Sequence, residues 1–153
     1  MKQRPQDPLQ AVEAAALRLL ARREHARAEL ARKLLARGHA AEAVAAVLDR
    51  LEAEGSLSEA RFAETYARSR AERGYGPLRI RQELRRHGID EARIEAALAA
   101  LEIDWAARAR ELCRKRFGPE PPRDWKARAR RLRYLQNRGF DPDFLRDFEA
   151  EGE

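Results

Sequence analysis

The chain has 153 residues, of which 44% are hydrophobic and 38% charged, and its 32 basic and 26 acidic residues give a net charge of +6. This length excludes a large multidomain enzyme, and the lack of any run of about 20 apolar residues excludes a membrane-spanning helix. Because Ala14–Leu17 is too short for a signal peptide and Cys113 is the single cysteine, we expect a cytoplasmic protein without disulfides, zinc clusters or membrane contact.

The chain is predicted to begin with a disordered lead over residues 1–10, which contains two prolines. After this lead, the motif Leu-x-x-x-Gly occurs three times, ending at Gly38, Gly88 and Gly139. A glycine four residues after an apolar helical position is typical of a left-handed helix C-terminus. The spacing of these glycines therefore predicts a structural unit that repeats about every 50 residues.

Each unit is predicted to contain three helices. The first helix of each unit has matching apolar positions at Val12, Phe62 and Leu112, and the middle helix leads into the glycine motif. The helix after the motif carries apolar residues at helical spacing, such as Val44–Leu51. In the third unit the last helix is expected to include Leu145 and Phe148. Alternation typical of strands is absent from the sequence. We therefore predict an all-α fold of three tandem three-helix repeats, over residues 11–55, 56–103 and 104–153, that forms an elongated, curved array.

Residues that could perform catalysis are few. The three histidines, His25, His39 and His87, have no partner four residues away for a shared metal, and we expect them at the surface or at helix ends. Cys113 is expected to be a packed thiol. Gly74–Gly76 lacks the Lys-Ser or Lys-Thr that follows a phosphate-binding loop, so it predicts a turn between helices. The sequence favours a protein that is not an enzyme and binds no metal or cofactor.

Aromatic residues have two interpretations. Tyr75 and Tyr134 lie beside basic residues, where they either pack against neighbouring helices or stack on bases or a partner. Trp105 and Trp125 stand near the predicted starts of helices in the third unit, and we expect both to pack in the core or between helices.

Basic residues recur in the middle helix of each unit. Of the 32 basic residues in the whole chain, 28 are arginines. One interpretation is a solvated helix face, and the other is a stripe that attracts phosphates or an acidic protein groove. Arginines spread over several helices suit contacts to a DNA backbone, single- or double-stranded, without sequence recognition. The segment 141–153 reverses the sign, with six carboxylates against Arg146, and is a candidate to compete for this basic surface.

Several motifs in this order resemble the RecX family of bacterial recombination regulators, from about residue 12 to residue 148. They are Arg23–Leu30 with Lys33-Leu34, Phe62, Tyr66–Arg70, Gly74–Gly76, Ile80–Leu84, Gly88-Ile89 and Tyr134–Phe140. The third unit departs from the family pattern in its helix phase and in its proline-rich loop, residues 118–122. The resemblance implies three tandem three-helix units without catalytic residues. It also implies binding to the RecA recombinase filament on DNA, which restrains filament growth, ATP hydrolysis and strand exchange.

Contact residues are assigned from this resemblance and from charge. They are Arg23, Arg27, Arg70, Arg73, Tyr75, Arg79, Arg81, Arg85, Arg86, Arg128, Arg131 and Arg138. We expect the protein to act as a monomer. Two other functions stay open from the sequence. One is a sequence-tolerant DNA-binding protein or helix-turn-helix regulator that acts without a recombinase, and the other is a helical scaffold for an unrelated acidic protein.

Overall fold

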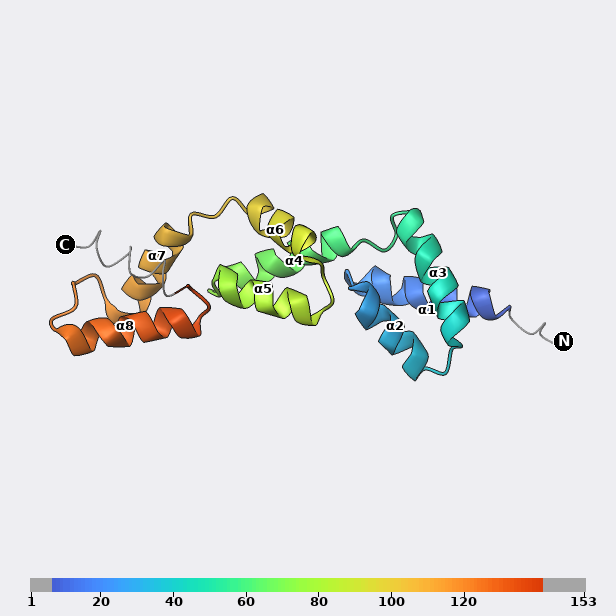
Figure 1. Ribbon diagram of the computed structural model, residues 1–153, viewed down its shortest axis with the longest axis horizontal. Helices are drawn as coiled ribbons and strands as arrows, with labels where there is room; N and C mark the ends of the chain where they lie inside the picture. Colours follow the sequence, from blue (N-terminus) through green and yellow to red (C-terminus); the bar gives the residue numbers. More distant parts are fainter. Residues whose placement is uncertain (1–6, 142–153) are drawn as a thin grey trace.

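A computed structural model describes residues 7–141, and over this range the chain is helical, with loops and turns but no strands (Figure 1). The helices are α1 Pro8–Arg22, α2 Arg27–Ala36, α3 Ala41–Ala53, α4 Glu59–Glu72, α5 Pro77–Arg86, α6 Glu91–Ala100, α7 Trp105–Phe117 and α8 Trp125–Asn137. None of the helices in the described range is long and apolar enough to cross a membrane. The predicted all-α fold is confirmed.

The helices form successive groups along the long axis of the molecule. Figure 1 shows α1–α3 at one end, α4–α6 in the middle and α7–α8 at the other end, so the predicted elongated array of repeats is confirmed. We call these groups units 1, 2 and 3. The third helix expected in unit 3, with Leu145 and Phe148, lies outside the described residues.

The first helix begins earlier than the sequence predicted. Residues 8–10 were expected in a disordered lead, but α1 starts at Pro8, and the Asp7 carboxylate accepts a hydrogen bond from the Leu9 amide at 3.1 Å. The expectation is therefore wrong for residues 8–10. The physical reason is that proline is preorganised for the first helical position, and an aspartate directly before it caps the free amides of the first helical turn.

The repeated glycine motif ends the middle helix of every unit. Gly38, Gly88 and Gly139 have φ of +90°, +79° and +101°, a backbone shape that glycine adopts without the steric penalty other residues meet. In each case the amide after the glycine donates a hydrogen bond of 3.1–3.3 Å to the carbonyl of the motif leucine. These bonds join His39 to Leu34, Ile89 to Leu84 and Phe140 to Leu135. The predicted helix stop is confirmed three times.

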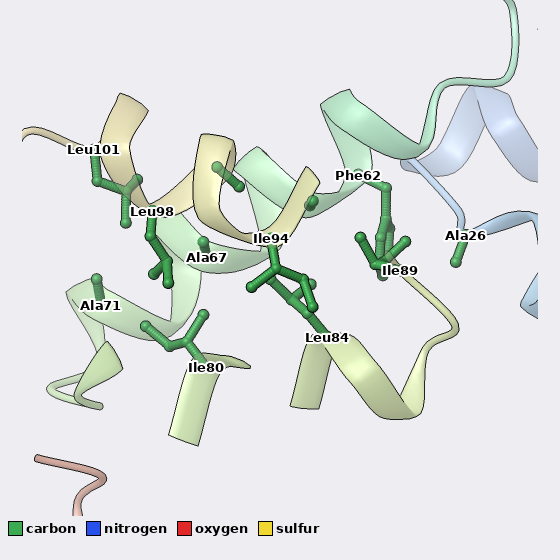
Figure 2. Packing of buried hydrophobic residues seen from close by; sticks show 12 residues of the cluster. Ala26, Phe62, Ala67, Ala71, Ile80, Leu84, Ile89, Ile94, Leu98 and Leu101 are labelled. Carbon is green, nitrogen blue, oxygen red and sulfur yellow. The ribbon is translucent and has the colours of Figure 1, made fainter. Parts of the chain in front are cut away.

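Each unit has its own apolar core. In unit 2, Ile80 and Leu84 of α5 point toward Ile94 and Leu98 of α6 across the small alanines of α4, including Ala67 (Figure 2). The cores of units 1 and 2 contain Val12 and Phe62, as predicted. The core described for unit 3 is smaller, and Leu112 is only half-buried there. Its fully packed positions on α7 are instead Ala109 and Cys113, which confirms the packed thiol.

Units 1 and 2 meet through the loop between α1 and α2. Ala26, in that loop, is fully buried in the core of unit 2, beside Phe62 and Ile89 (Figure 2). Arg61 of α4 donates a hydrogen bond to Glu24 at 2.8 Å across the same joint. A small buried apolar side chain and an ion pair are thus both part of the contact between units 1 and 2.

Units 2 and 3 are joined by backbone hydrogen bonds. The Gly76 amide donates to the Arg138 carbonyl at 2.7 Å, and the Leu78 amide donates to the Gly139 carbonyl at 2.9 Å. A Cβ atom at Gly76 would lie 2.6 Å from the Gly139 oxygen, and one at Gly139 would lie 2.3 Å from the Arg79 Cβ. The two backbone segments can approach this closely only because both positions are occupied by glycine.

Arginines of unit 3 also cap the end of α4. Arg108 donates a hydrogen bond of 2.7 Å to the Ala71 carbonyl, and Arg138 donates one of 3.4 Å to the Arg73 carbonyl. The last carbonyls of a helix lack partners within the helix and carry partial negative charge, so guanidinium groups are favourable there. The joint therefore orients unit 3 against the C-terminal end of α4.

Candidate functional site

Tyr75, in the turn between α4 and α5, is surrounded by three guanidinium groups. The Cζ atoms of Arg70, Arg79 and Arg138 lie 4.0, 4.2 and 5.1 Å from the centre of its ring. Guanidinium groups over an aromatic face are stabilised by the electron-rich ring. The structure thus brings together four of the residues assigned from the sequence, from units 2 and 3, at the joint between these units.

Glu83 holds two arginines of this cluster through its carboxylate. Its carboxylate accepts hydrogen bonds from Arg70 at 2.8 Å through both Nε and Nη2, from the Tyr66 hydroxyl at 2.8 Å and from Arg79 Nε at 3.1 Å. Burial opposes ionisation of Glu83, but these donors outweigh it and hold the pKa of the carboxyl below its usual value. Burial and the hydrogen bond to Glu83 raise the pKa of Tyr66 to about 12. Tyr66 and Arg70, both on α4, therefore help to fix α4 against α5 through Glu83.

Most other assigned arginines in units 1 and 2 are paired with carboxylates. The pairs are Arg23 with Glu29, Arg27 with Asp49 and Glu52, Arg81 with Glu95, and Arg85 with Glu91. Their positive charge is therefore neutralised locally. Arg73 and Arg86 are the exceptions, because both are exposed and form no ion pair with a carboxylate in the described part of the chain.

The basic residues of unit 3 differ from those of units 1 and 2. Residues 114–133 contain nine basic residues against two acidic ones, a net charge of +7. Among residues 7–141, eight of these basic side chains have no carboxylate partner; they are Arg114, Arg116, Arg123, Lys126, Arg128, Arg130, Arg131 and Arg133. The predicted stripe is therefore uneven, and most of its uncompensated charge lies on α7, α8 and the loop between them.

Two assigned residues, Arg128 and Arg131, line a cavity between α7 and α8. The cavity has a volume of about 220 Å³, and apolar groups such as Leu132 and Leu135 form part of its wall. Burial raises the pKa of Cys113, which also lines it, while the nearby Arg131 opposes this effect only in part. The thiol is consequently protonated at neutral pH and is a poor nucleophile.

One histidine is buried where an exposed position was expected. His25 lies just before the start of α2, near a helix end as predicted, but it is only 1% exposed. Its Nδ1 lies 3.0 Å from the Arg23 carbonyl and its Nε2 lies 3.0 Å from Lys33 Nζ, a pattern that fits a neutral ring donating through Nδ1. Burial is the main cause that lowers the pKa of His25. Helical spacing does not predict this burial, because the residues around the ring come from a loop and from the next helix.

The two tryptophans have opposite environments. Trp105 packs edge-on against Phe140, with ring centres 6.3 Å apart, as predicted. Trp125 is 74% exposed, so its predicted packing role is wrong. Helical spacing places Trp125 on the same face as the half-buried Leu132, seven residues later. Within the described residues, however, no neighbouring element covers the first turn of α8.

Comparison with known proteins agrees with this architecture. The chain matches family models for the first, second and third three-helix domains of RecX, over residues 14–51, 58–98 and 102–147. It is 51% identical over 137 residues to the regulatory protein RecX of Halorhodospira halophila, covering 90% of this chain and 85% of that protein. It is 47% identical over 135 residues to the regulatory protein RecX of Pseudomonas entomophila, covering 88% and 87% of the two chains.

Solved structures show the same fold. The crystal structure of RecX from Lactobacillus salivarius aligns with a TM-score of 0.80, covering 95% of this chain and 96% of that one, at 22% sequence identity. A second structure, of a regulatory protein RecX, aligns with a TM-score of 0.79 over 98% of this chain and 82% of that one.

Proposed function

Because this chain belongs to the RecX family of regulatory proteins, we propose that it binds the RecA recombinase filament on DNA and inhibits its assembly, ATP hydrolysis and strand exchange. In this role it regulates recombinational DNA repair in the cytoplasm as a monomer. It breaks no covalent bond and uses no cofactor. The observation that carries the proposal is the match of all three units, in order, to the three domains of the family.

The shape of the molecule supports this function. A chain of units along one axis presents a long surface, which suits contact with several successive subunits of a filament better than with one small ligand (Figure 1). The backbone joint between units 2 and 3 fixes how their surfaces are placed relative to each other. Binding then requires little ordering of these two units, which limits its entropic cost.

The two kinds of arginine support different contacts. The exposed pairs of units 1 and 2, such as Arg81 with Glu95, contribute little to stability, so their guanidinium groups can exchange an internal carboxylate for one on the recombinase. The unpaired groups of unit 3, including Arg128 and Arg131, suit DNA phosphates. We propose the twelve residues assigned from the sequence as contacts on this basis, with Arg138 and Tyr75 at the joint.

The direct test measures RecA-dependent ATP hydrolysis on single-stranded DNA while this protein is added. We expect inhibition at amounts below one molecule per recombinase subunit. The variant with Arg81→Gln and Arg85→Gln should require at least about tenfold more protein for the same inhibition of ATP hydrolysis, since charge-assisted hydrogen bonds each contribute about 1.5 to 3 kcal/mol. The matched control carries Arg50→Gln and Arg68→Gln, two paired and exposed arginines outside the assigned set.

The control variant should inhibit like the wild type, and circular dichroism should show equal helicity for all three proteins. Unchanged ATP hydrolysis at saturating wild-type protein would contradict the proposed function. Equal loss of inhibition in both double variants would show that net charge matters rather than the assigned positions.

Sequence-tolerant DNA binding without a recombinase is a second candidate, and the uncompensated charge of residues 114–133 favours it. It predicts tight binding to bare duplex that weakens steeply with salt. Such binding with no effect on recombinase activity would support this second function in place of the first.

A further inference from the structure

A polar groove runs along the joint between units 2 and 3. It has a volume of about 310 Å³ and lies between α5 and the C-terminal end of α8. The residues that line it are Leu78, Arg79, Gln82, Glu83, Arg86, Gln136, Asn137 and Gly139. The hydrogen bond from the Leu78 amide to the Gly139 carbonyl crosses this joint, so the two walls of the groove are held beside each other by main chain.

Three carboxamide side chains line the groove, those of Gln82, Gln136 and Asn137. All three are exposed, and each NH2 group offers two hydrogen-bond donors. The main chain beside them is already paired. The Gly139 carbonyl accepts a hydrogen bond from Leu78, and the Gln136 carbonyl accepts one of 3.0 Å from the Gly139 amide. The hydrogen-bonding capacity of this groove therefore comes from its side chains.

Two guanidinium groups give the groove a positive charge. Arg86 is exposed and forms no ion pair with a carboxylate in the described range. Arg79 donates to Glu83 through Nε at 3.1 Å, a bond that leaves its two Nη groups available to a ligand. Glu83 is the single carboxylate of the groove among residues 7–141, and Arg70 already neutralises it through two hydrogen bonds of 2.8 Å. The groove thus presents mainly donors and uncompensated positive charge.

Amide and guanidinium donors along one groove match the oxygens of a phosphodiester chain, because Arg, Asn and Gln side chains are among the usual donors to DNA phosphates. We propose that this groove binds the sugar-phosphate backbone of a nucleic-acid strand. Arg79 and Arg86 neutralise phosphates there. The carboxamides of Gln82, Gln136 and Asn137 donate hydrogen bonds to phosphate oxygens, and the contact reads no base.

An acidic protein surface fits this groove less well. Protein interfaces are organised around a desolvated core in which aromatic and apolar groups are enriched. Within residues 7–141, Leu78 is the only large apolar residue that lines the groove. A nucleic-acid strand offers acceptor oxygens at every nucleotide, so both the arginines and the uncharged carboxamides find partners on it. The inference rests on the proposed function, because it names a place where the chain contacts DNA within the filament.

The test uses the full chain without recombinase and a fluorescent oligonucleotide of thymidines. Gln82→Ala should weaken binding about 2- to 12-fold, the range of one hydrogen bond, and leave its salt dependence unchanged. Arg86→Gln should weaken binding and also reduce the slope of log affinity against log salt by about 0.7, the value for one phosphate contact on a single strand. On an abasic strand of equal length and charge, both variants should lose affinity by the same factors.

Matched controls come from unit 1. Gln10→Ala removes an exposed carboxamide from α1 and should leave the affinity unchanged. Arg37→Gln removes an exposed guanidinium from the corresponding end of α2, and its affinity and salt slope should stay close to those of the wild type. Because all four substituted side chains are exposed, circular dichroism should show unchanged helicity in every variant.

Equal affinity of the wild type, Gln82→Ala and Arg86→Gln for the thymidine strand would overturn the inference. Equal losses in the groove variants and their controls would do the same, because binding would then follow overall composition and charge. Losses confined to the thymidine strand would also overturn it, since they would indicate contacts to bases.

Recombinase inhibition by the same variants separates this inference from the proposed function. Loss of inhibition in Gln82→Ala with unchanged DNA affinity would assign the groove to a protein contact and overturn the inference. A wild type that inhibits the recombinase without binding the oligonucleotide overturns this inference alone. Binding that depends on Gln82 and Arg86 without recombinase inhibition supports the inference and contradicts the proposed function.

Discussion

The joint between units 2 and 3 allows a prediction with a matched control in the same molecule. Gly139 and Gly38 both end a middle helix, with φ of +101° and +90°. A Cβ atom at Gly38 would meet nothing within 4 Å, whereas one at Gly139 would lie 2.3 Å from the Arg79 Cβ and 2.8 Å from the Arg79 amide nitrogen. Alanine at either position therefore adds backbone strain, but only at Gly139 does it also add a clash with another unit.

The expected costs follow from these distances. Left-handed backbone in a residue other than glycine costs about 1 to 2 kcal/mol, which applies to both variants. Forcing an extra carbon into packed structure costs about 1 to 3 kcal/mol more, which applies to Gly139→Ala alone. We therefore expect Gly38→Ala to lower the free energy of unfolding by about 1 to 2 kcal/mol and Gly139→Ala to lower it by about 2 to 5 kcal/mol.

Urea unfolding followed by circular dichroism measures both free energies. In a Trp125→Phe background, the fluorescence of Trp105, which packs on Phe140 next to Gly139, reports the joint separately. Its emission should change in folded Gly139→Ala and stay constant in Gly38→Ala. Equal destabilisation by the two variants, with unchanged Trp105 emission, would refute the close approach of units 2 and 3.

Three other predictions concern buried groups. Glu83→Gln should lower the free energy of unfolding by about 1.5 to 3 kcal/mol, because it removes a charged acceptor from three donors. In the same variant, an absorbance titration should show the pKa of Tyr66 moving down from about 12. The control Glu95→Gln, at an exposed ion pair, should lower the free energy of unfolding by less than about 1 kcal/mol. His25 has a lowered pKa, so below pH 6.5 the unfolded chain binds more protons at this site than the folded one. The urea midpoint should fall as the pH drops through 6.5, and a His25→Gln variant that keeps the same pH dependence would contradict this origin. Leu84→Ala should cost about 2 to 5 kcal/mol in urea unfolding, since the side chain is 0% exposed, and a cost below 1 kcal/mol would contradict its place in the core.

Local sequence signals predicted the helix ends well. The glycine motif depends on backbone shape and on a hydrogen bond between residues close in sequence, so Gly38, Gly88 and Gly139 could be interpreted without any tertiary information. Ser58 and Asp90 cap α4 and α6 by accepting hydrogen bonds from the amides three residues later. Signals between residues close in sequence were therefore enough to predict the number and order of the described helices.

The state of each arginine could not be predicted in the same way. Arg79 and Glu83 are four residues apart on one helix, a pair that helical spacing indicates. Arg81 pairs with Glu95 and Arg61 with Glu24, and these contacts arise only when separate elements of the fold pack together. The burial of His25 and the exposure of Trp125 likewise depend on which elements lie beside them.

The contact between units 2 and 3 has a consequence for how the chain tolerates change. Its two central hydrogen bonds, from Gly76 and Leu78, run from main chain to main chain and require no particular functional group. Surface residues on both sides can be exchanged while the angle between the units stays fixed, provided that the two glycines remain. Unit 3 therefore keeps a fixed orientation relative to unit 2, and redesign of its exposed face for a new ligand should leave that orientation unchanged.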